Sequence, residues 1–199
     1  MTPQQPIETL VTTILRDLVT EFCFHPEALE IRATSLRRIV NIEWRAHRAD
    51  TSRIIGEKGA NFRPLVDLVH HIGLLRDCEV RLKRLGEPVV GSIERYQGFK
   101  ANPKWPHKRI VELMQRTAEA ATASGMAEIE TVDIGGDDTA CNISIARSES
   151  AHTAAVLGET MKHIFGIIGN RHGRVLLIQV TPELDAETQP ETAAGRFAK

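Results

Sequence analysis

Two glycines three residues apart stand between two stretches of helical spacing in the first half of the chain. The segment reads Arg53-Ile54-Ile55-Gly56-Glu57-Lys58-Gly59-Ala60-Asn61-Phe62-Arg63-Pro64-Leu65. Glycine at positions 56 and 59 removes two Cβ atoms, so the backbone can turn sharply and a sugar–phosphate chain can approach it closely. The turn leads into the start of a helix, where unpaired N–H groups and the positive end of the dipole favour phosphate oxygens. The segment predicts a phosphate-binding loop, with a tight turn between two packed helices as the alternative.

Charged residues surround this loop and set its electrostatic character. Lys58 supplies a positive charge inside the loop, and Glu57 beside it offsets that charge. Four arginines close in the sequence are candidates for a basic rim: Arg45, Arg48, Arg53 and Arg63. Glu43 and Asp50 are near enough to pair with some of them, so each single arginine fits a solvated surface equally well. Taken together with Lys58, the arginines favour a basic surface beside the loop.

A second basic stretch lies in the middle of the chain. Residues 91–109 carry 5 Lys and Arg against 1 Asp or Glu, although the whole chain has a net charge of −1. Aromatic side chains alternate with these cations, a mixture that stacks bases at about 1–3 kcal/mol per base while neutralising phosphate. The candidate contacts are Arg95, Tyr96, Lys100, Lys104 and Trp105. The alternative is that Tyr96, Phe99 and Trp105 pack this segment against a folded domain.

The elements that must hold the loop follow from apolar spacing and from turn residues. Over residues 1–88 these patterns predict the order helix, strand, strand, helix, helix, strand. The predicted bounds are a helix over 6–22, strands over 29–33 and 37–47 with a corner at Thr34-Ser35, a short helix through Ser52–Ile55 capped by Asp50 or Thr51, a helix from Phe62 that ends at Gly73, and a strand over 78–85. The second of these strands alternates apolar and polar residues, which is typical of a half-buried strand.

A similar pattern returns after a segment rich in glycine and proline. Residues 89–106 are predicted to be a linker, and residues 107–181 a second domain. Its predicted elements are a helix over 110–118, strands over 127–133 and 139–147 joined by a turn over 135–138, a helix over 152–168 and a strand over 174–180. Val156–Met161 aligns loosely with Ile54–Gly59, but Met161 replaces the second glycine and Glu159 is acidic. We expect the second domain to lack the loop, and residues 182–199 to be a disordered tail.

The segment from Arg53 to Leu65, set between two adjacent helices, resembles the I-I-G-x-x-G-x-x-I core of the K-homology (KH) domain family, type II. The resemblance implies an α+β fold of two tandem KH type II-like units, each a three-stranded sheet covered by helices, the second without the glycine loop. It also implies a non-catalytic protein that binds single-stranded RNA, about four nucleotides per domain, as small bacterial KH proteins do. Motif and basic rim together place the RNA contacts at Arg45, Arg48, Arg53, Ile54, Ile55, Gly56, Glu57, Lys58, Gly59, Phe62 and Arg63.

The resemblance also assigns roles to individual side chains. Ile54 and Ile55 would wall the RNA groove and pack the core, in an order that periodicity leaves open, and bases would lie near Trp44 or Arg45. Glu57 departs from the family, which often carries a basic or neutral residue there. The alternative function is a protein-interaction or ribosome-assembly module that uses the KH fold as a scaffold and has little affinity for free RNA. With either function, the second domain would bind ribosomal RNA or a protein partner, or would pack only against the first domain.

Other chemistries find little support in the sequence. Cys23, Cys78 and Cys141 form no Cys-x-x-Cys pair and the histidines show no metal-binding spacing, so no metal or cofactor is expected. The sequence contains no Walker loop and no nucleophile elbow, so we do not expect an enzyme. No apolar run reaches about 18 residues and the N-terminus lacks the features of a secretion signal, so we expect a cytoplasmic protein without membrane contact. The oligomeric state and the preferred RNA sequence stay open.

Overall fold

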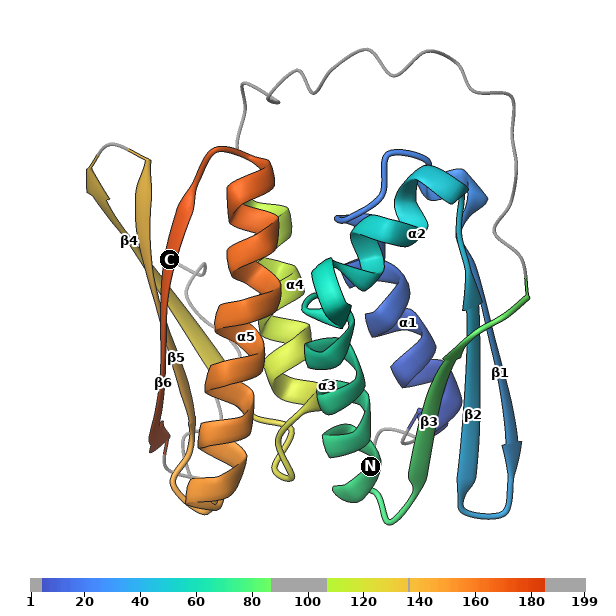
Figure 1. Cartoon of the computed structure of the whole chain (residues 1–199). Coiled ribbons are helices and arrows are strands. Elements are labelled where there is room, and N and C mark those ends of the chain that lie inside the picture. Colours follow the sequence, from blue (N-terminus) through green and yellow to red (C-terminus); the bar gives the residue numbers. More distant parts are fainter. Residues whose placement is uncertain (1–4, 87–106, 136, 185–199) are drawn as a thin grey trace, which may run out of the picture.

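The computed structural model describes residues 5–86, 107–135 and 137–184. Within these residues the chain forms five α-helices and two three-stranded sheets, which is an α+β architecture. The two sheets lie on the outside and the helices lie between them, so the layers run sheet, helix, helix, sheet (Figure 1). None of the described helices is long and apolar enough to cross a membrane.

The first unit contains the glycine loop. Its elements are α1 (Ile7–Thr20), β1 (Glu30–Leu36), β2 (Ile39–Arg45), α2 (Arg48–Ile55), α3 (Phe62–Leu74) and β3 (Glu79–Arg84), with 3₁₀ turns at Pro26–Ala28 and Glu57–Gly59. The predicted order of helices and strands is confirmed. β1 pairs antiparallel with β2, and β2 pairs parallel with β3, so β2 is the central strand. Parallel pairing requires a crossover connection, which α2 and α3 supply.

The alternation of side chains in β2 shows how this sheet meets the helices. Val40, Ile42 and Trp44 are buried in the core, and the residues between them lie on the opposite face of the sheet. α1 presents a stripe of apolar side chains at helical spacing to the same core, with Leu15 and Leu18 fully buried. β2 and α1 are therefore each held in place by one buried face, and the apolar pattern of the sequence predicts that face in both.

One turn prediction in this unit is wrong. Thr34 and Ser35, predicted as a corner, lie inside β1 and pair with β2. The chain turns at Arg37 instead, with a φ of 57°. The helix end predicted at Gly73 lies within one residue of the end of α3 at Leu74. Gly73 itself is helical, and a Cβ there would come 2.7 Å from the carbonyl oxygen of Cys78. Close approach of the backbone to β3, rather than helix termination, accounts for this glycine.

The start of α2 also differs from the prediction. The helix begins at Arg48, and its N-cap is His47, whose Nδ1 accepts a hydrogen bond from the N–H of Ala49 at 3.2 Å. Asp50, predicted as a cap, is fully buried and accepts hydrogen bonds from two N–H groups in the segment after α1. Thr51 donates its hydroxyl to the carbonyl of His47 at 3.1 Å. A tertiary contact therefore gives Asp50 another role, and Thr51 bonds back to the residue that precedes its own helix.

The second unit has the same sheet topology, with a single long helix between its parallel strands. Its elements are α4 (His107–Ala120), β4 (Ala127–Gly135), β5 (Asp138–Ala146), α5 (Ala151–Arg171) and β6 (Val175–Leu184). β4 pairs antiparallel with β5, and β5 pairs parallel with β6. Residues 182–184, predicted as part of a disordered tail, belong to β6 because they continue its pairing with β5. The predicted linker, residues 89–106, and residues 185–199 lie outside the described residues.

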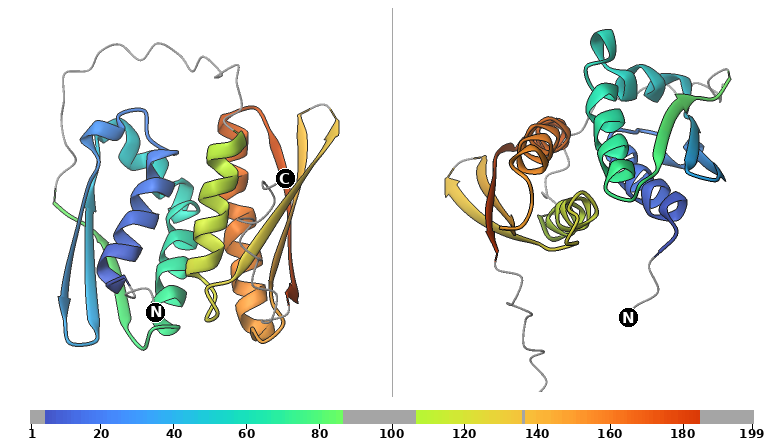
Figure 2. Two further views of the ribbon diagram at one scale, coloured as in Figure 1. Left: turned by 180° about the vertical axis from the view of Figure 1, so that it is seen from behind. Right: turned by 90° about the horizontal axis from the view of Figure 1, so that it is seen from below.

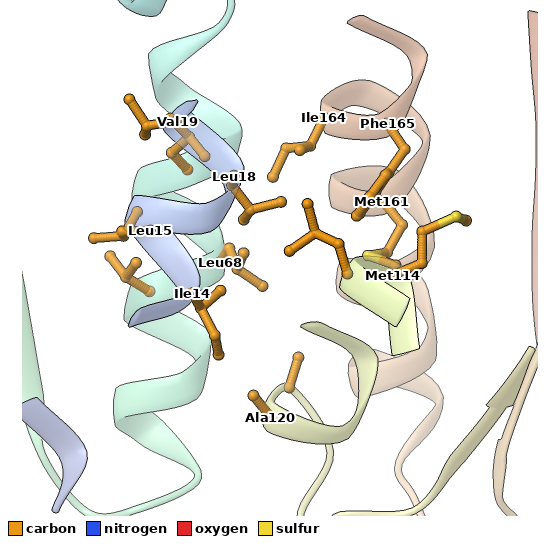
Figure 3. Packing of buried hydrophobic residues seen from close by; sticks show 14 of the residues in the cluster. Ile14, Leu15, Leu18, Val19, Leu68, Met114, Ala120, Met161, Ile164 and Phe165 are labelled. Atoms are coloured by element: carbon orange, nitrogen blue, oxygen red, sulfur yellow. The ribbon is translucent and has the colours of Figure 1, made fainter. Parts of the chain in front are cut away.

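The helices of the two units pack against each other and form one core. α3 lies beside α5, and α1 lies beside α4 (Figure 2). Figure 3 shows Leu18 and Leu68 of the first unit facing Met114 and Ile164 of the second, and all four side chains are buried. The two sheets therefore enclose a shared apolar interior instead of two separate ones.

Hydrogen bonds and one ion pair also connect the two units at the edges of this apolar interface. His71 Nε2 lies 3.0 Å from the carbonyl oxygen of Ala121, and Arg76 donates to a neighbouring carbonyl of the second unit at 2.9 Å. Asp17 of α1 and Arg116 of α4 form an ion pair at 2.8 Å. These contacts link α1 and the C-terminal end of α3 to α4 and the residue after it, so each unit restricts the movement of the other.

Candidate functional site

The turn between α2 and α3 is built from unusual backbone conformations. α2 is followed by its C-cap Gly56, whose φ of 72° and ψ of 173° fall in a region that is almost closed to residues with a side chain. Lys58, with a φ of 50°, and Gly59, with a φ of 84°, are left-handed. The N–H of Asn61 donates to the carbonyl of Ile55 at 3.2 Å and closes the turn just before α3.

The two glycines meet different demands. A Cβ at Gly56 would lie 2.7 Å from both the Cγ and the backbone nitrogen of Asn61, so this position has no room for a side chain. A Cβ at Gly59 would meet a single heavy atom within 4 Å, the Nε of Arg63 at 3.9 Å. Gly56 is therefore required by packing, whereas Gly59 leaves open space on the outside of the turn.

The outer surface of the turn faces solvent. Glu57, Lys58 and Arg63 are exposed, and the turn projects beyond the neighbouring helices in the right-hand view of Figure 2. It stands at the N-terminal end of α3, the end at which the helix dipole is positive. An anion that approaches here meets a cation, a stretch of main chain without a side chain, and a helix N-terminus.

Several predicted contact residues support the turn from inside. Ile54 is buried in the core, and Ile55 is half-buried and packs against it. The ring of Phe62 is half-buried and lies 5.6 Å from the ring of Trp44. Trp44 is only 3% exposed, so its ring is not available to stack on a base. These side chains hold the turn in place and offer little surface to a ligand.

The arginines of the predicted basic rim do not all gather at the turn. Arg53 donates to the carbonyl of Phe22 at 3.2 Å and stacks on the ring of Phe24 at 3.8 Å. Arg45 lies on the face of the sheet that points away from the helices and donates to Glu30 at 2.6 Å, and this hydrogen bond lowers the pKa of Glu30. Both guanidinium groups are therefore engaged within the protein.

The other two arginines are exposed. Arg48 is the first residue of α2, and about 10 Å of helix separates it from the turn. Arg63 lies in the first turn of α3, directly beside Gly59. The structure therefore brings together Glu57, Lys58, Gly59 and Arg63 on one surface. The second candidate surface, Arg95, Tyr96, Lys100, Lys104 and Trp105, lies outside the described residues.

The second unit has no counterpart of this turn between β5 and β6. The aligned segment Val156–Met161 lies inside α5. Gly158 is buried there, and a Cβ at this position would come 3.7 Å from Val180. Met161 is fully buried in the core. The surface that the turn offers in the first unit is replaced by continuous helix.

A cluster of charged residues at the junction of the two units was not predicted from the sequence. Glu21, next to the end of α1, is buried, pairs with Arg109, and lies 3.8 Å from the Nε2 of His172. Arg171 donates to backbone carbonyls in the same segment. Burial lowers the pKa of both Arg171 and His172. The hydrogen-bonding partners are 88 to 150 residues apart, so no local pattern could reveal them.

The described residues contain few side chains suited to metal binding or to thiol chemistry. In the part of the chain that the structure describes, no three His, Cys, Asp or Glu side chains are grouped so as to hold a metal ion. Burial raises the pKa of Cys23 to about 12 and that of Cys141 to about 11, so both thiols stay protonated near neutral pH.

In comparisons with known proteins, no family model and no curated protein matches this chain. The geometry of the turn is therefore the main guide to function.

Proposed function

We propose that the first unit is a KH type II domain and that the protein binds single-stranded RNA without catalysing a reaction. The observation that carries the proposal is the exposed Gly56–Gly59 turn at the N-terminus of α3. The turn lies between two helices that connect the parallel strands β2 and β3. The order of elements and the place of the turn within it both support this assignment.

The surface of the turn offers three means of holding an RNA backbone. Gly59 leaves space in which a phosphate can approach the main chain. Lys58 adds a positive charge, and Arg63 can donate two parallel hydrogen bonds to phosphate oxygens. The N-terminus of α3 favours the same oxygens. Because phosphate contacts carry no base information, we expect broad tolerance of RNA sequence.

Glu57 opposes this attraction and makes the turn a weak site. It is exposed beside Lys58, so the two charges nearly cancel at a distance. Replacing Glu57 by lysine should therefore strengthen RNA binding and steepen its dependence on salt.

The experiment is a titration of a fluorescent single-stranded RNA of about 12 nucleotides with the protein, followed by anisotropy at several salt concentrations. We expect the logarithm of the association constant to fall with the logarithm of salt at a slope of about −0.7 per phosphate contacted. Replacing Glu57 and Lys58 by two aspartates should abolish binding and leave the melting temperature near that of the wild type, because both side chains are exposed.

A matched control places the same two substitutions elsewhere. Glu43 and Lys83 form an ion pair at 3.2 Å on the outer face of the first sheet. Replacing this pair by two aspartates changes the net charge by the same amount at a distance from the turn. RNA affinity should survive in the control. If both variants lose affinity equally, the effect is one of overall charge, and the turn is not the binding site.

A second candidate function is protein binding by the second unit, favoured by exposed apolar residues on its sheet. Val132 of β4 and Leu177 of β6 flank Ala140 of β5 in one row across the sheet, and Val175 stands in the next row beside Asp138. Val132, Val175 and Leu177 are 44%, 48% and 52% exposed. The charged residues at outward-facing positions of β4 and β5 are acidic: Glu128, Glu130 and Asp138. This surface suits a protein segment that carries apolar side chains flanked by lysine or arginine.

The test of this second function uses a synthetic helical peptide with a leucine stripe flanked by lysines, and a scrambled peptide of the same composition. The first peptide should bind more tightly than the second, and the double variant Val132→Ser, Leu177→Ser should remove the difference. Equal binding of both peptides would mean that charge alone attracts them. A wild-type protein without measurable RNA affinity that still discriminates between the peptides would favour this function over the first.

A further inference from the structure

The end of α5, in the second unit, holds the segment that follows α1 in the first. Arg171, the last residue of α5, donates hydrogen bonds to the carbonyl oxygens of Glu21 and Cys23, the latter at 2.7 Å. A longer contact of 3.5 Å reaches the carbonyl of Thr20. These carbonyls lie at the C-terminal end of α1, where the backbone lacks helical partners. The half-buried guanidinium of the other unit donates to those of Glu21 and Cys23, whereas the carbonyl of Thr20 also accepts from the N–H of Cys23.

The same segment is the platform on which α2 rests. The buried carboxylate of Asp50 accepts hydrogen bonds from the N–H of Phe24 and from that of the next residue, at 2.7 and 2.8 Å. Arg53 donates to the carbonyl of Phe22 and stacks on the ring of Phe24 at 3.8 Å. The guanidinium of Arg171 lies 5.6 Å from the centre of that ring. α2 and the end of α5 therefore both contact one short segment of chain, residues 20–25 (Figure 1).

α2 in turn holds the glycine turn. The side chain of Asn61 donates to the carbonyl oxygen of Arg53 at 2.7 Å, and Asn61 is also the residue against which Gly56 packs. α2 has only eight residues, and a helix so short is not stable alone in water, so its place depends on tertiary contacts. A continuous series of contacts thus leads from Arg171 through residues 20–25 and α2 to the turn.

From this arrangement we infer that Arg171 is a positioning residue for the glycine turn, through which the second unit fixes α2 and keeps the turn ready for RNA. Its consequence for RNA binding rests on the proposed function, whereas its effect on α2 does not. A turn that is already ordered loses less conformational freedom on binding, which raises affinity without any contact between Arg171 and RNA. The second unit, which lacks a turn of this kind between β5 and β6, thereby gains a role in the activity of the first.

The experiment compares Arg171→Ala with the wild type by amide hydrogen exchange and by RNA anisotropy, at a temperature well below the unfolding transition. We expect exchange in residues 20–25 and 48–60 to become about tenfold faster, because local opening no longer breaks these contacts. RNA affinity should fall about three- to tenfold. Leu157→Ala is the control, since Leu157 is buried in the other half of α5, about 21 Å along the helix from Arg171. It should lower global stability and leave both readouts near wild type.

Each result for Arg171→Ala tests either the positioning role of Arg171 or RNA binding by the protein. Exchange in residues 48–60 that stays within about twofold of the wild type overturns the inference, whatever the RNA affinity. Faster exchange in a protein that binds no RNA supports the positioning role and refutes the proposed function. If Arg171→Ala does not fold, Arg171→Lys decides by the same criterion, because lysine keeps the charge but cannot donate to several carbonyls from one planar group.

Discussion

The two glycines of the turn should differ in how well they tolerate alanine. In Gly56→Ala the new Cβ would lie 2.7 Å from two atoms of Asn61, in a backbone conformation with φ 72° and ψ 173°. That conformation costs a residue with a side chain about 1–3 kcal/mol. Displacing Asn61 would also break its hydrogen bond to the carbonyl of Arg53, which contributes about 0.5–1.5 kcal/mol. We expect Gly56→Ala to lower the free energy of unfolding by about 2–4 kcal/mol.

Gly59→Ala meets no such obstruction. Its φ of 84° is left-handed, which costs about 1–2 kcal/mol, but the new Cβ would stay 3.9 Å from its nearest neighbour, the Nε of Arg63. For a chain of this length each kcal/mol corresponds to about 2–4 °C in melting temperature. Thermal and urea unfolding followed by circular dichroism should therefore show about twice the loss for Gly56→Ala. An equal loss in both variants, or a larger one for Gly59→Ala, would refute the assignment of Gly56 to packing.

Three further predictions concern the interface between the two units. Burial lowers the pKa of His71 below its usual 6.5. The unfolded chain therefore binds more protons than the folded protein as the pH falls below about 6.5, and the stability present above that pH is lost on acidification. His71→Gln, which keeps a donor but does not titrate, should show a smaller fall in melting temperature between about pH 7 and pH 5, and an equal fall would contradict this. Arg109→Ala would leave the buried carboxylate of Glu21 without its arginine partner, with His172 still 3.8 Å away, and should cost about 1–3 kcal/mol in urea unfolding; an unchanged midpoint would count against the pairing with Arg109. Phe165→Ala removes a fully buried ring and should cost about 3–5 kcal/mol. Because the core is shared, the unfolding transition that Trp44 fluorescence reports in the other unit, measured in a Trp105→Phe background, should shift together with the transition by circular dichroism. A Trp44 transition at an unchanged midpoint would contradict a single core.

The elements with one buried face could be predicted from the sequence. The alternation in β2 identifies both the strand and its inward side, and the stripe on α1 does the same for that helix. The glycine turn was visible as well, because Gly56 and Gly59 stand where a side chain is either obstructed or strained. In each case the cause is local, since it acts within one element or one turn.

The features that the sequence did not reveal depend on contacts between distant segments. Asp50 has the right chemistry for a helix cap, yet its carboxylate bonds a segment 25 and 26 residues earlier. Arg53 was a candidate RNA contact, but an acceptor 31 residues away and the ring of Phe24 engage it. Which side chains a charged residue will meet is decided by the packing of helices, and spacing in the sequence carries no record of that packing.

The most direct test of RNA binding by the turn is the change in backbone amide resonances when single-stranded RNA of about eight nucleotides is added to the labelled protein. If RNA binds at the turn, the largest changes will be at residues 57–63, and the outward-facing residues of β4, such as Glu128 and Glu130, will be unaffected. RNA binding at the turn would be contradicted by large changes at other resonances while those of residues 57–63 do not shift. It would also be contradicted if no resonance shifts at millimolar RNA.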